Sequence, residues 1–465
     1  MIDTLRLTAE EAAAMLERGE VSAEELHAAY ASRDDDVHAY LKRLAHDGAT
    51  GIPIALKDVI GTKGVETTAG SKILKGYVPV YDSTVAARVK DAGLSLLGKT
   101  NTDEFAMGSS TENSAYGPSL NPWDPTRVPG GSGGGSAAAV SAGLAPWALG
   151  SDTGGSIKQP AALCGIVGLR PTYGTVSRYG IVAFASSLDQ VGPTAKTVRD
   201  TALLYRIIAG KDACDSTTVD APTVELPVAE DLNGIRIGVP KEMNDAEGIE
   251  AGVKDAARRA IDLCVELGAE VEECSLPRSV EYGLPCYYLV APAEASSNLA
   301  RYDGVRFGFR ADVGDRDLTE LYERTRDEGF GDEPKRRIML GTYALSAGYY
   351  DAYYGQAQKV RTLIIREHAE LFERFDVLVS PTSPTVAFER GAKTQNPLAM
   401  YLSDLLTIPS CMAGLPGLNI PCGLSEGLPV GLQLVGPQLS ENVLFRVGHA
   451  LERALGFDTV PERLR

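Results

Sequence analysis

Two glycine-rich stretches decide how this chain folds: Arg127-Val-Pro-Gly-Gly-Ser132-Gly-Gly-Gly-Ser136-Ala-Ala-Ala-Val140 and Gly150-Ser-Asp-Thr-Gly-Gly-Ser156-Ile-Lys-Gln-Pro160. Taken alone, the first has the composition of a flexible linker. A run of helix-forming residues follows it at once, and the second stretch comes a few residues later, which argues against a linker. Glycines let two backbone segments approach closely and leave amide N–H groups free to point at one place, as an oxyanion hole requires. We therefore expect the two stretches to line a common site.

Around these stretches the chain alternates short apolar runs with longer amphipathic ones, which predicts an α/β protein. Two capping boxes, Thr8-Ala-Glu-Glu11 and Ser22-Ala-Glu-Glu25, predict short helices at the start. The expected strands are 52–56, 94–97, 235–239, 377–379 and 430–435, and the expected helices include 83–92 and 253–267. We expect one domain over residues 1–465, with a central mixed β-sheet covered by helices on both faces and the helical segment 1–50 packed on it. Residues 210–232 should form a surface excursion.

Composition limits the possible functions. The chain has 45 Lys and Arg against 62 Asp and Glu, a formal charge of -17, so we do not expect it to bind nucleic acid strongly by itself. Its seven cysteines form no Cys-x-x-Cys pair and no histidine has metal-ligand spacing, so neither a disulfide framework nor a zinc site is expected. The opening residues lack an export-signal pattern, and no apolar run is long enough to span a bilayer. We expect a cytoplasmic protein.

Two short motifs point to other chemistries. Residues 130–134 match the Gly-x-Ser-x-Gly elbow of α/β-hydrolases, but the only histidines that follow, His368 and His449, lie in amphipathic helical runs. Residues 93–100 match the phosphate-loop pattern, but a helical run precedes them and their middle has the character of a buried strand. We therefore expect neither a Ser-His-Asp triad nor a nucleotide site.

Lys57 is the remaining candidate for activating a serine. It follows the apolar run 51–56, and a charged side chain at the end of a buried strand is unusual. Alone, it would be explained as a surface lysine with its stem packed on apolar neighbours. The two glycine-serine stretches favour a catalytic role. Such a lysine must be desolvated, because with a pKa of about 10.4 it is protonated at neutral pH and is no base.

Lys57 and the blocks around Ser132 and Ser156, in this order, resemble the amidase signature family over nearly the whole chain. The resemblance implies that Ser156 is the acyl-forming nucleophile, Ser132 the bridging serine that passes on its proton, and Lys57 the neutral base. It also implies an oxyanion hole made of the backbone N–H groups of Thr153, Gly154, Gly155 and Ser156. Two positions outside the relay depart from the family pattern, Gly133 in place of serine and Lys158 in place of arginine.

Within this family, longer stretches resemble the A subunits of tRNA-dependent amidotransferases. They include Asn101-Thr-Asp-Glu-Phe-Ala-Met-Gly108, Gly348-Tyr-Tyr-Asp-Ala-Tyr-Tyr354 and Met400-Tyr-Leu-Ser-Asp404-Leu-Leu-Thr. The resemblance implies a glutaminase that supplies ammonia for transamidation of Glu-tRNA(Gln), Asp-tRNA(Asn) or both. It also implies B and C subunits as partners in a heterotrimer. ATP and magnesium would then be bound by the B subunit, whereas this chain would carry no cofactor.

Glutamine carries a carboxylate and an ammonium, so its site should hold one fixed cation and one fixed anion. By resemblance these are Arg337, which can clamp a carboxylate through two hydrogen bonds, and Asp404, which would face the ammonium. One of Tyr287 and Tyr288 should add a hydroxyl contact, and we favour Tyr287. The alternative for Arg337 and Asp404 is a solvated surface pair. Two other functions stay open: a stand-alone amide hydrolase with the same signature, and a non-catalytic scaffold subunit.

Overall fold

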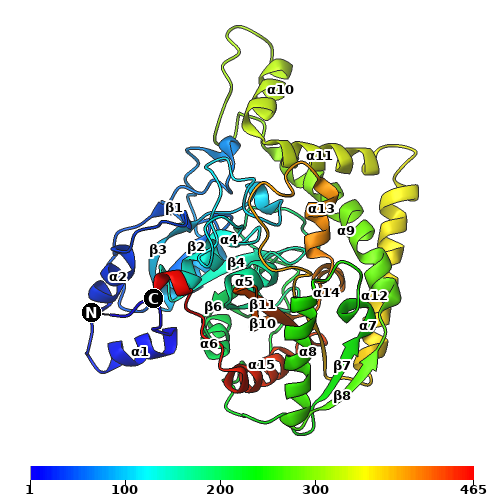
Figure 1. The fold of residues 1–465 in the computed structure, drawn as a ribbon. Helices are drawn as coiled ribbons and strands as arrows, with labels where there is room; N and C mark the ends of the chain where they lie inside the picture. Colours follow the sequence, from blue (N-terminus) through cyan, green and yellow to red (C-terminus); the bar gives the residue numbers. More distant parts are fainter. Residues whose placement is uncertain (1) are drawn as a thin grey trace.

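The structure is a computed structural model that describes residues 2–465, and its centre is one eleven-stranded mixed sheet (Figure 1). The strands are β1 Tyr40–Arg43, β2 Pro53–Lys57, β3 Ser95–Thr100, β4 Trp147–Asp152, β5 Val167–Arg170, β6 Gln190–Ala195, β7 Arg236–Pro240, β8 Glu270–Cys274, β9 Val377–Pro381, β10 Gly417–Ser425 and β11 Leu428–Val435. They lie in the order β1-β3-β2-β4-β6-β5-β10-β11-β9-β7-β8. β2 pairs in parallel with β3 and β4, and β7 pairs in parallel with β8 and β9, whereas the other neighbours are antiparallel.

Helices surround this sheet. The α-helices are α1 Ala9–Glu17, α2 Ala23–Ala31, α3 Thr84–Asp91, α4 Gly134–Ser141, α5 Lys158–Cys164, α6 Val198–Ile208, α7 Lys241–Asn244, α8 Ala251–Glu266, α9 Pro277–Asn298, α10 Leu318–Gly329, α11 Asp332–Leu345, α12 Gln356–Phe372, α13 Pro397–Tyr401, α14 Ile408–Met412 and α15 Glu441–Leu455. Shorter turns are η1 Lys72–Leu74, η2 Glu104–Ala106, η3 Leu299–Arg301, η4 Asp351–Gly355, η5 Leu402–Asp404 and η6 Glu462–Leu464, of which η4 is a π-helix. No helix in residues 2–465 combines the length and the apolar character needed to cross a lipid bilayer.

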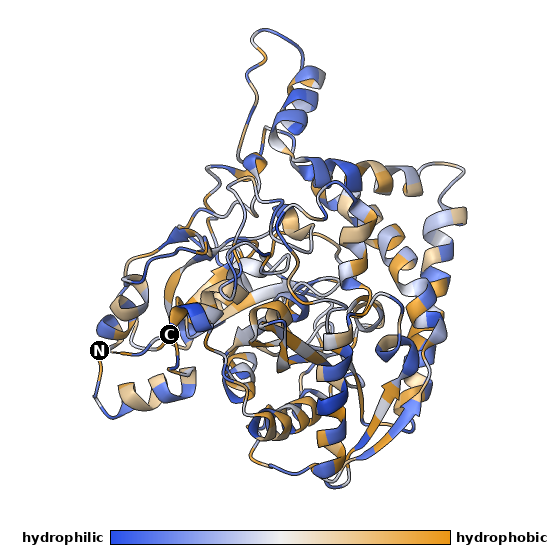
Figure 2. Ribbon diagram, in the orientation of Figure 1, coloured by the Kyte–Doolittle hydropathy of each residue, from blue (hydrophilic) through white to orange (hydrophobic). Residues whose placement is uncertain are grey.

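Strand β10 shows that helices cover both faces of the sheet. Its residues alternate in direction: Asn419 and Ala162 of α5 lie on the same side of Gly431, whereas Leu418 and Ile420 lie against Gly448 of α15. Apolar residues concentrate on the inner strands and on the helix surfaces turned toward them (Figure 2). The predicted fold class, a central mixed sheet with helices on both faces, is confirmed.

The predicted elements agree with the structure to within a few residues. The five expected strands appear as β2, β3, β7, β9 and β11, and the expected helices as α3 and α8. Thr8 and Ser22 cap α1 and α2 through complete capping boxes, as predicted. Residues 210–232 contain no helix or strand, which confirms the surface excursion.

The N-terminal segment is fastened to the sheet by buried charged groups. The carboxylate of Asp200 accepts the N–H groups of Ala9 (3.0 Å) and Glu10 (2.8 Å) at the start of α1. Lys196 Nζ donates to the carbonyl oxygens of Thr4 (2.6 Å) and Leu7 (2.9 Å). β1 then adds to the sheet edge by pairing with β3. The division of the chain into one domain with a packed segment 1–50 stays a prediction.

Candidate active site

The parallel strands β3, β2 and β4 end at the same edge of the sheet and bring three segments together. Lys57 is the last residue of β2, and Asp152 is the last residue of β4. The segment that begins at Asn101 leaves the end of β3. The two glycine-rich stretches meet at this edge.

Lys57 lies at the centre of the site. It is fully buried, and its Nζ lies 2.7 Å from Ser132 Oγ. The same nitrogen donates to the Oγ (3.0 Å) and carbonyl oxygen (3.1 Å) of Ser151. The structure thus brings together two of the predicted relay residues and adds Ser151 as a second serine on the lysine.

Burial decides the protonation of Lys57. Removal of the ammonium from water lowers the pKa of Lys57 to about 7, although the carboxylates of Asp103, Asp152 and Asp189 act in the opposite direction. A neutral amine is therefore accessible near neutral pH. A lysine base must be neutral, and the structure shows the burial that makes this possible. The sequence alone did not show that burial.

Ser156 lies in the loop between β4 and α5, beside Ser132. The N–H of Gly133 donates to the carbonyl oxygen of Ser156 (3.0 Å), which ties the two glycine-rich stretches together. A Cβ at Gly133 would lie 2.4 Å from that oxygen, so glycine suits this close approach. Ser156 keeps 7% exposure, whereas Ser132 is fully buried. Of the two serines, only Ser156 keeps some exposed surface.

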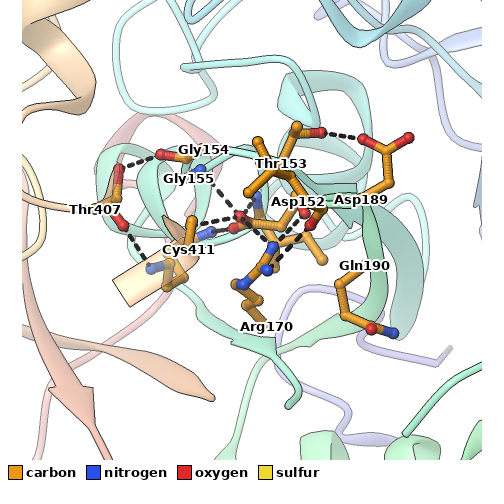
Figure 3. Close-up of polar contacts among 12 residues, drawn as sticks. Asp152, Thr153, Gly154, Gly155, Arg170, Asp189, Gln190, Thr407 and Cys411 are labelled. Atoms are coloured by element: carbon orange, nitrogen blue, oxygen red, sulfur yellow. Dashed lines mark hydrogen bonds and ion pairs between the residues drawn. The ribbon is translucent and has the colours of Figure 1, made fainter. Parts of the chain in front are cut away.

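The carboxylate of Asp152 organises the loop that carries Ser156 (Figure 3). It accepts the N–H groups of Gly155 (2.9 Å) and Ile157 (3.1 Å), and it lies 3.4 Å from the guanidinium of Arg170. Burial alone would raise the pKa of this carboxyl, but Lys158 and Arg170 outweigh burial and hold it below its usual value. Asp152 is thus an ionised carboxylate that fixes the conformation of the loop through these hydrogen bonds.

Some backbone N–H groups of the Ser156 loop donate a hydrogen bond within the protein, and others do not. The N–H of Gly155 donates to Asp152 in this structure, and the expectation that it lines an oxyanion hole stays a prediction. Among residues 2–465, the N–H groups of Thr153, Gly154 and Ser156 have no hydrogen-bond acceptor. These three donors remain candidates for the oxyanion hole.

Neighbouring side chains hold the same loop in place. Thr407 Oγ1 donates to the carbonyl oxygen of Gly154 (2.6 Å), and Thr153 Oγ1 donates to the carboxylate of Asp189 (2.7 Å). Gly155 has a φ of +141°, and a Cβ there would lie 2.2 Å from Thr407 Oγ1. Only glycine fits this position without a shift of the loop.

Lys158, the departure from the family's arginine, is a buried anchor. Its Nζ donates to Ser410 Oγ (2.8 Å), Gln433 Oε1 (2.9 Å) and the carbonyl oxygen of Thr407 (3.3 Å). The ammonium therefore joins the first turn of α5 to α14 and β11. Lysine lacks the planar set of donors that arginine has. The ammonium of Lys158 nevertheless makes three hydrogen bonds, so its buried charge has partners.

Arg337 has the surroundings of a carboxylate clamp and is not a solvated surface residue. It is 2% exposed, and its Nε donates to Glu333 Oε1 (2.8 Å) one turn earlier on α11. Its two terminal amino groups make no hydrogen bond within residues 2–465. The guanidinium lies over the rings of Tyr288 and Tyr401, at 5.2 and 5.4 Å, and lines a cavity of about 250 Å³. A ligand carboxylate could bind this free edge through two parallel bonds.

Asp404, the predicted complementary anion, is also a buried residue. It is 8% exposed, and its Oδ2 accepts the hydroxyl of Ser109 (2.5 Å). Its Oδ1 is buried and has no partner within residues 2–465, which leaves it free for a ligand cation. Burial raises the pKa of Asp404 to about 7, against the Ser109 hydrogen bond and Arg337. Asp404 and Arg337 are therefore both buried at the site, and the alternative of a solvated pair is wrong.

The two tyrosines occupy different positions. Tyr287 lies against the loop, because a Cβ at Gly154 would lie 3.0 Å from its hydroxyl oxygen. Tyr288 lies beside Arg337 and stacks on Tyr401, with ring centroids 3.9 Å apart. The preference for Tyr287 as the hydroxyl contact stays a prediction.

The structure rejects both alternative motifs. His368 Nδ1 lies 3.0 Å from the carbonyl oxygen of Ile364 within α12, and His449 lies 3.8 Å from Glu452 within α15. Lys99 of the phosphate-loop pattern is a buried residue of β3, and its Nζ lies 3.3 Å from Asp58. Neither histidine contacts Ser132, and Lys99 is not available to a phosphate.

Sequence reasoning missed the side chains that orient the predicted ones. These are Ser151 on Lys57, Ser109 on Asp404 and Glu333 on Arg337. Only Glu333 had a readable signal, since an acidic residue four positions before an arginine on one helix makes a contact pair. Ser109 and Asp404 are far apart in sequence, so folding alone brings them together.

The fold and the site define a class: an α/β enzyme in which a buried lysine, in place of histidine, contacts a serine of a glycine-rich stretch. A family model described as Amidase matches residues 10–445, and the chain belongs to this family.

The chain is similar over its full length to particular relatives. It is 56% identical to the A subunit of the glutamyl-tRNA(Gln) amidotransferase of Roseiflexus castenholzii, over 99% of each chain. The solved structure of the corresponding A subunit from Thermotoga maritima superposes with a TM-score of 0.84 at 45% identity, covering 97% of this chain and 96% of that one. The peptide amidase of Stenotrophomonas maltophilia has a TM-score of 0.80 at 28% identity, covering 98% of each chain. The same fold therefore also occurs in a peptide amidase.

Proposed function

We propose that this chain is the glutamine-hydrolysing A subunit of a tRNA-dependent amidotransferase. The observation that carries the proposal is the pair of buried opposite charges, Arg337 and Asp404, each with an edge free for a ligand beside the Ser156 loop. Thr407, three residues after Asp404, contacts Gly154 of that loop, so the anion and the nucleophile belong to one site. A free amino acid with an amide side chain fits this combination. The full-length similarity to amidotransferase A subunits supports the same substrate.

The relay supplies the chemistry. Ser156 Oγ attacks the side-chain amide carbon of glutamine, and its proton passes through Ser132 Oγ to the neutral amine of Lys57. The oxyanion that forms is stabilised by the free N–H groups of the 153–156 loop. The intermediate collapses with return of a proton to the leaving nitrogen, which releases ammonia and leaves a glutamyl ester on Ser156. Water then cleaves the ester by the same route, to give glutamate and the free enzyme.

Partners complete the reaction. In the proposed complex a B subunit binds the charged tRNA and activates it with ATP and magnesium, and a C subunit joins the two larger chains. This chain uses no cofactor of its own, and ammonia passes from it to the B subunit. We place the complex in the cytoplasm, where charged tRNA is made and used. The relatives' name indicates Glu-tRNA(Gln) as the acceptor to test first, with Asp-tRNA(Asn) as the second.

The experiment measures ammonia release from glutamine for the chain alone and for the co-expressed complex. We expect turnover that rises with the partners and falls by about a thousandfold or more in Ser156→Ala. Glutamine that is never hydrolysed, together with rapid hydrolysis of simple amides, would assign the protein to the stand-alone amidases. A complex that transamidates normally from glutamine with Ser156→Ala would reduce the chain to a scaffold.

A further inference from the structure

The segment 103–111, which follows β3, contacts each functional part of the site. Its residues 103–108 belong to the stretch that resembles the amidotransferase A subunits. No atom of the segment takes part in the proton relay, although the carboxylate of Asp103 acts to raise the pKa of Lys57. Three of its non-glycine residues have left-handed backbone conformations, with φ of 53° at Phe105, 60° at Ala106 and 59° at Thr111. Such conformations persist only where the surroundings enforce them, and they concentrate at functional sites.

Glu104 fastens the helix that carries Arg337. Its Oε2 accepts the N–H of Gly331 (2.9 Å), the N-cap residue of α11, and its Oε1 accepts the hydroxyl of Ser71 (2.5 Å). Gly331 has no side chain that could cap α11, and Glu104 binds the N–H of this N-cap residue from another part of the chain. A Cβ at Gly331 would lie 2.3 Å from Glu104 Oε2, so the contact is close.

Phe105 packs against the connection between α10 and α11 through an apolar contact. Its ring lies 5.6 Å from that of Phe330, the first of the two residues between α10 and α11, and Phe105 is fully buried. This connection lies close in sequence to Arg337, the proposed partner of the substrate carboxylate. Glu333 is the second residue of α11, and it binds both Arg337 Nε (2.8 Å) and the Tyr401 hydroxyl (3.0 Å).

Asp103 fastens the other half of the site. It is fully buried, and its carboxylate accepts the N–H groups of Thr111 (2.9 Å) and Asn113 (3.1 Å). The hydroxyl of Thr111 donates to the carbonyl oxygen of Gly130 (2.8 Å) and accepts the N–H of Gly134 (3.1 Å). These two glycines flank Ser132 at two residues on either side, so Asp103 acts on the bridging serine through Thr111.

We propose that residues 103–111 form a positioning segment in which Asp103 places the Ser132 relay and Glu104 places the Arg337 clamp. Two adjacent carboxylates then control turnover and substrate binding separately. Ser109, which donates to Asp404, extends the segment to the third functional group. The assignment of Glu104 rests on the proposed function, because it assumes that Arg337 binds the substrate's α-carboxylate.

The test compares Glu104→Gln and Asp103→Asn in the co-expressed complex, with glutamine and with a simple amide that has no carboxylate. Glu104→Gln should raise KM for glutamine about tenfold with kcat within about twofold, and should leave hydrolysis of the simple amide within about twofold. Asp103→Asn should lower kcat about tenfold for both substrates with KM nearly unchanged. Absence of glutamine turnover in the wild type would refute the proposed function, and it would be seen before any variant is compared.

Asp200→Asn is the matched control. Asp200 is also a fully buried carboxylate that caps a helix start, but α1 lies far from α11 along the sheet (Figure 1). We expect it to lower the melting temperature while leaving kcat and KM within about twofold. If Glu104→Gln does not fold, Ser71→Ala removes the hydroxyl on the other carboxylate oxygen and should raise KM in the same direction. The proposal is overturned if both carboxylate variants change the same parameter, or if the control changes the parameters equally.

Discussion

Burial of Lys57 determines what the two serines can do. A surface lysine with its usual pKa would hold its proton at pH 7, whereas the pKa of about 7 for Lys57 makes the amine available. Three carboxylates near it, Asp103, Asp152 and Asp189, keep the pKa from falling further. The site thus balances desolvation against negative charge, and the ammonium formed during attack on the substrate is stabilised by the same carboxylates.

We expect kcat for glutamine hydrolysis to rise with pH through about 7. The neutral amine of Lys57 is the active form, so activity is lost as pH falls below its pKa of about 7. Asp404, with a pKa raised to about 7, must be ionised to bind an ammonium, so KM should increase over the same acidic range. Steady-state kinetics of the complex from about pH 5 to pH 9 measures both effects. A kcat that stays constant across this range would rule out Lys57 as the base.

Arg337→Lys tests the carboxylate clamp. Lysine keeps the charge but loses the planar pair of donors, so KM for glutamine should rise about tenfold or more. Arg374→Lys, on an exposed pair with Glu272, is the control and should leave KM unchanged. An unchanged KM in Arg337→Lys would remove Arg337 from the substrate site.

At the scale of elements, the loop between β4 and α5 is the part on which activity depends most. Three hydrogen bonds fix this loop. Asp152 accepts the N–H of Gly155, Thr407 donates to the carbonyl oxygen of Gly154, and the N–H of Gly133 donates to the carbonyl oxygen of Ser156. None of these partners is close to the loop in sequence except Asp152. A loop this constrained can present free N–H groups without reorganisation during the reaction.

Gly155→Ala should abolish most activity while the protein still folds. The φ of +141° and the 2.2 Å approach to Thr407 leave no room for a Cβ, and we expect a loss of about 1–3 kcal/mol in the free energy of unfolding. Gly427→Ala, at a φ of +77° in the exposed β10–β11 turn with nothing within 4 Å, is the control. It should lower stability by about 1 kcal/mol, less than Gly155→Ala because no atom meets its Cβ, and should leave kcat unchanged. Equal kcat losses in both variants would show a general effect of stability.

Sequence predicted some elements and missed others for identifiable reasons. β2, β3, β7, β9 and β11 carry apolar runs that are typical of buried strands. β4, Trp-Ala-Leu-Gly-Ser-Asp, and β10, which contains two glycines and a proline, lack β-branched runs, and only pairing within the sheet makes them strands. The order of the strands also depends on contacts between distant segments, which a single sequence does not display.

For the whole molecule, the sheet explains how the site assembles. The ends of β3, β2 and β4 collect at one edge the segment 103–111, Lys57 and the Ser156 loop. Sequence patterns indicated Lys57, Ser132, Ser156, Arg337 and Asp404, because each lies in a recognisable stretch. Their catalytic and binding roles stay predictions, and the supporting side chains, such as Ser109 and Glu104, could be assigned only from their contacts.

The net negative charge of the chain predicts weak binding of RNA by the chain alone. With a formal charge of -17, the chain alone should not bind tRNA measurably at physiological salt, whereas the co-expressed complex should. Fluorescence anisotropy with labelled tRNA, in parallel with the complex, measures this difference. Salt-sensitive tRNA binding by the isolated chain would contradict the proposed division of labour.

The most direct test of the central claim is to find the covalent intermediate. The complex would be mixed with glutamine, quenched in acid, digested and examined by mass spectrometry. The proposed mechanism predicts a glutamyl ester on the peptide that contains Ser156, absent from Ser156→Ala. A glutamyl group on Ser132 or on a cysteine, or continued glutamine turnover by Ser156→Ala, would contradict it.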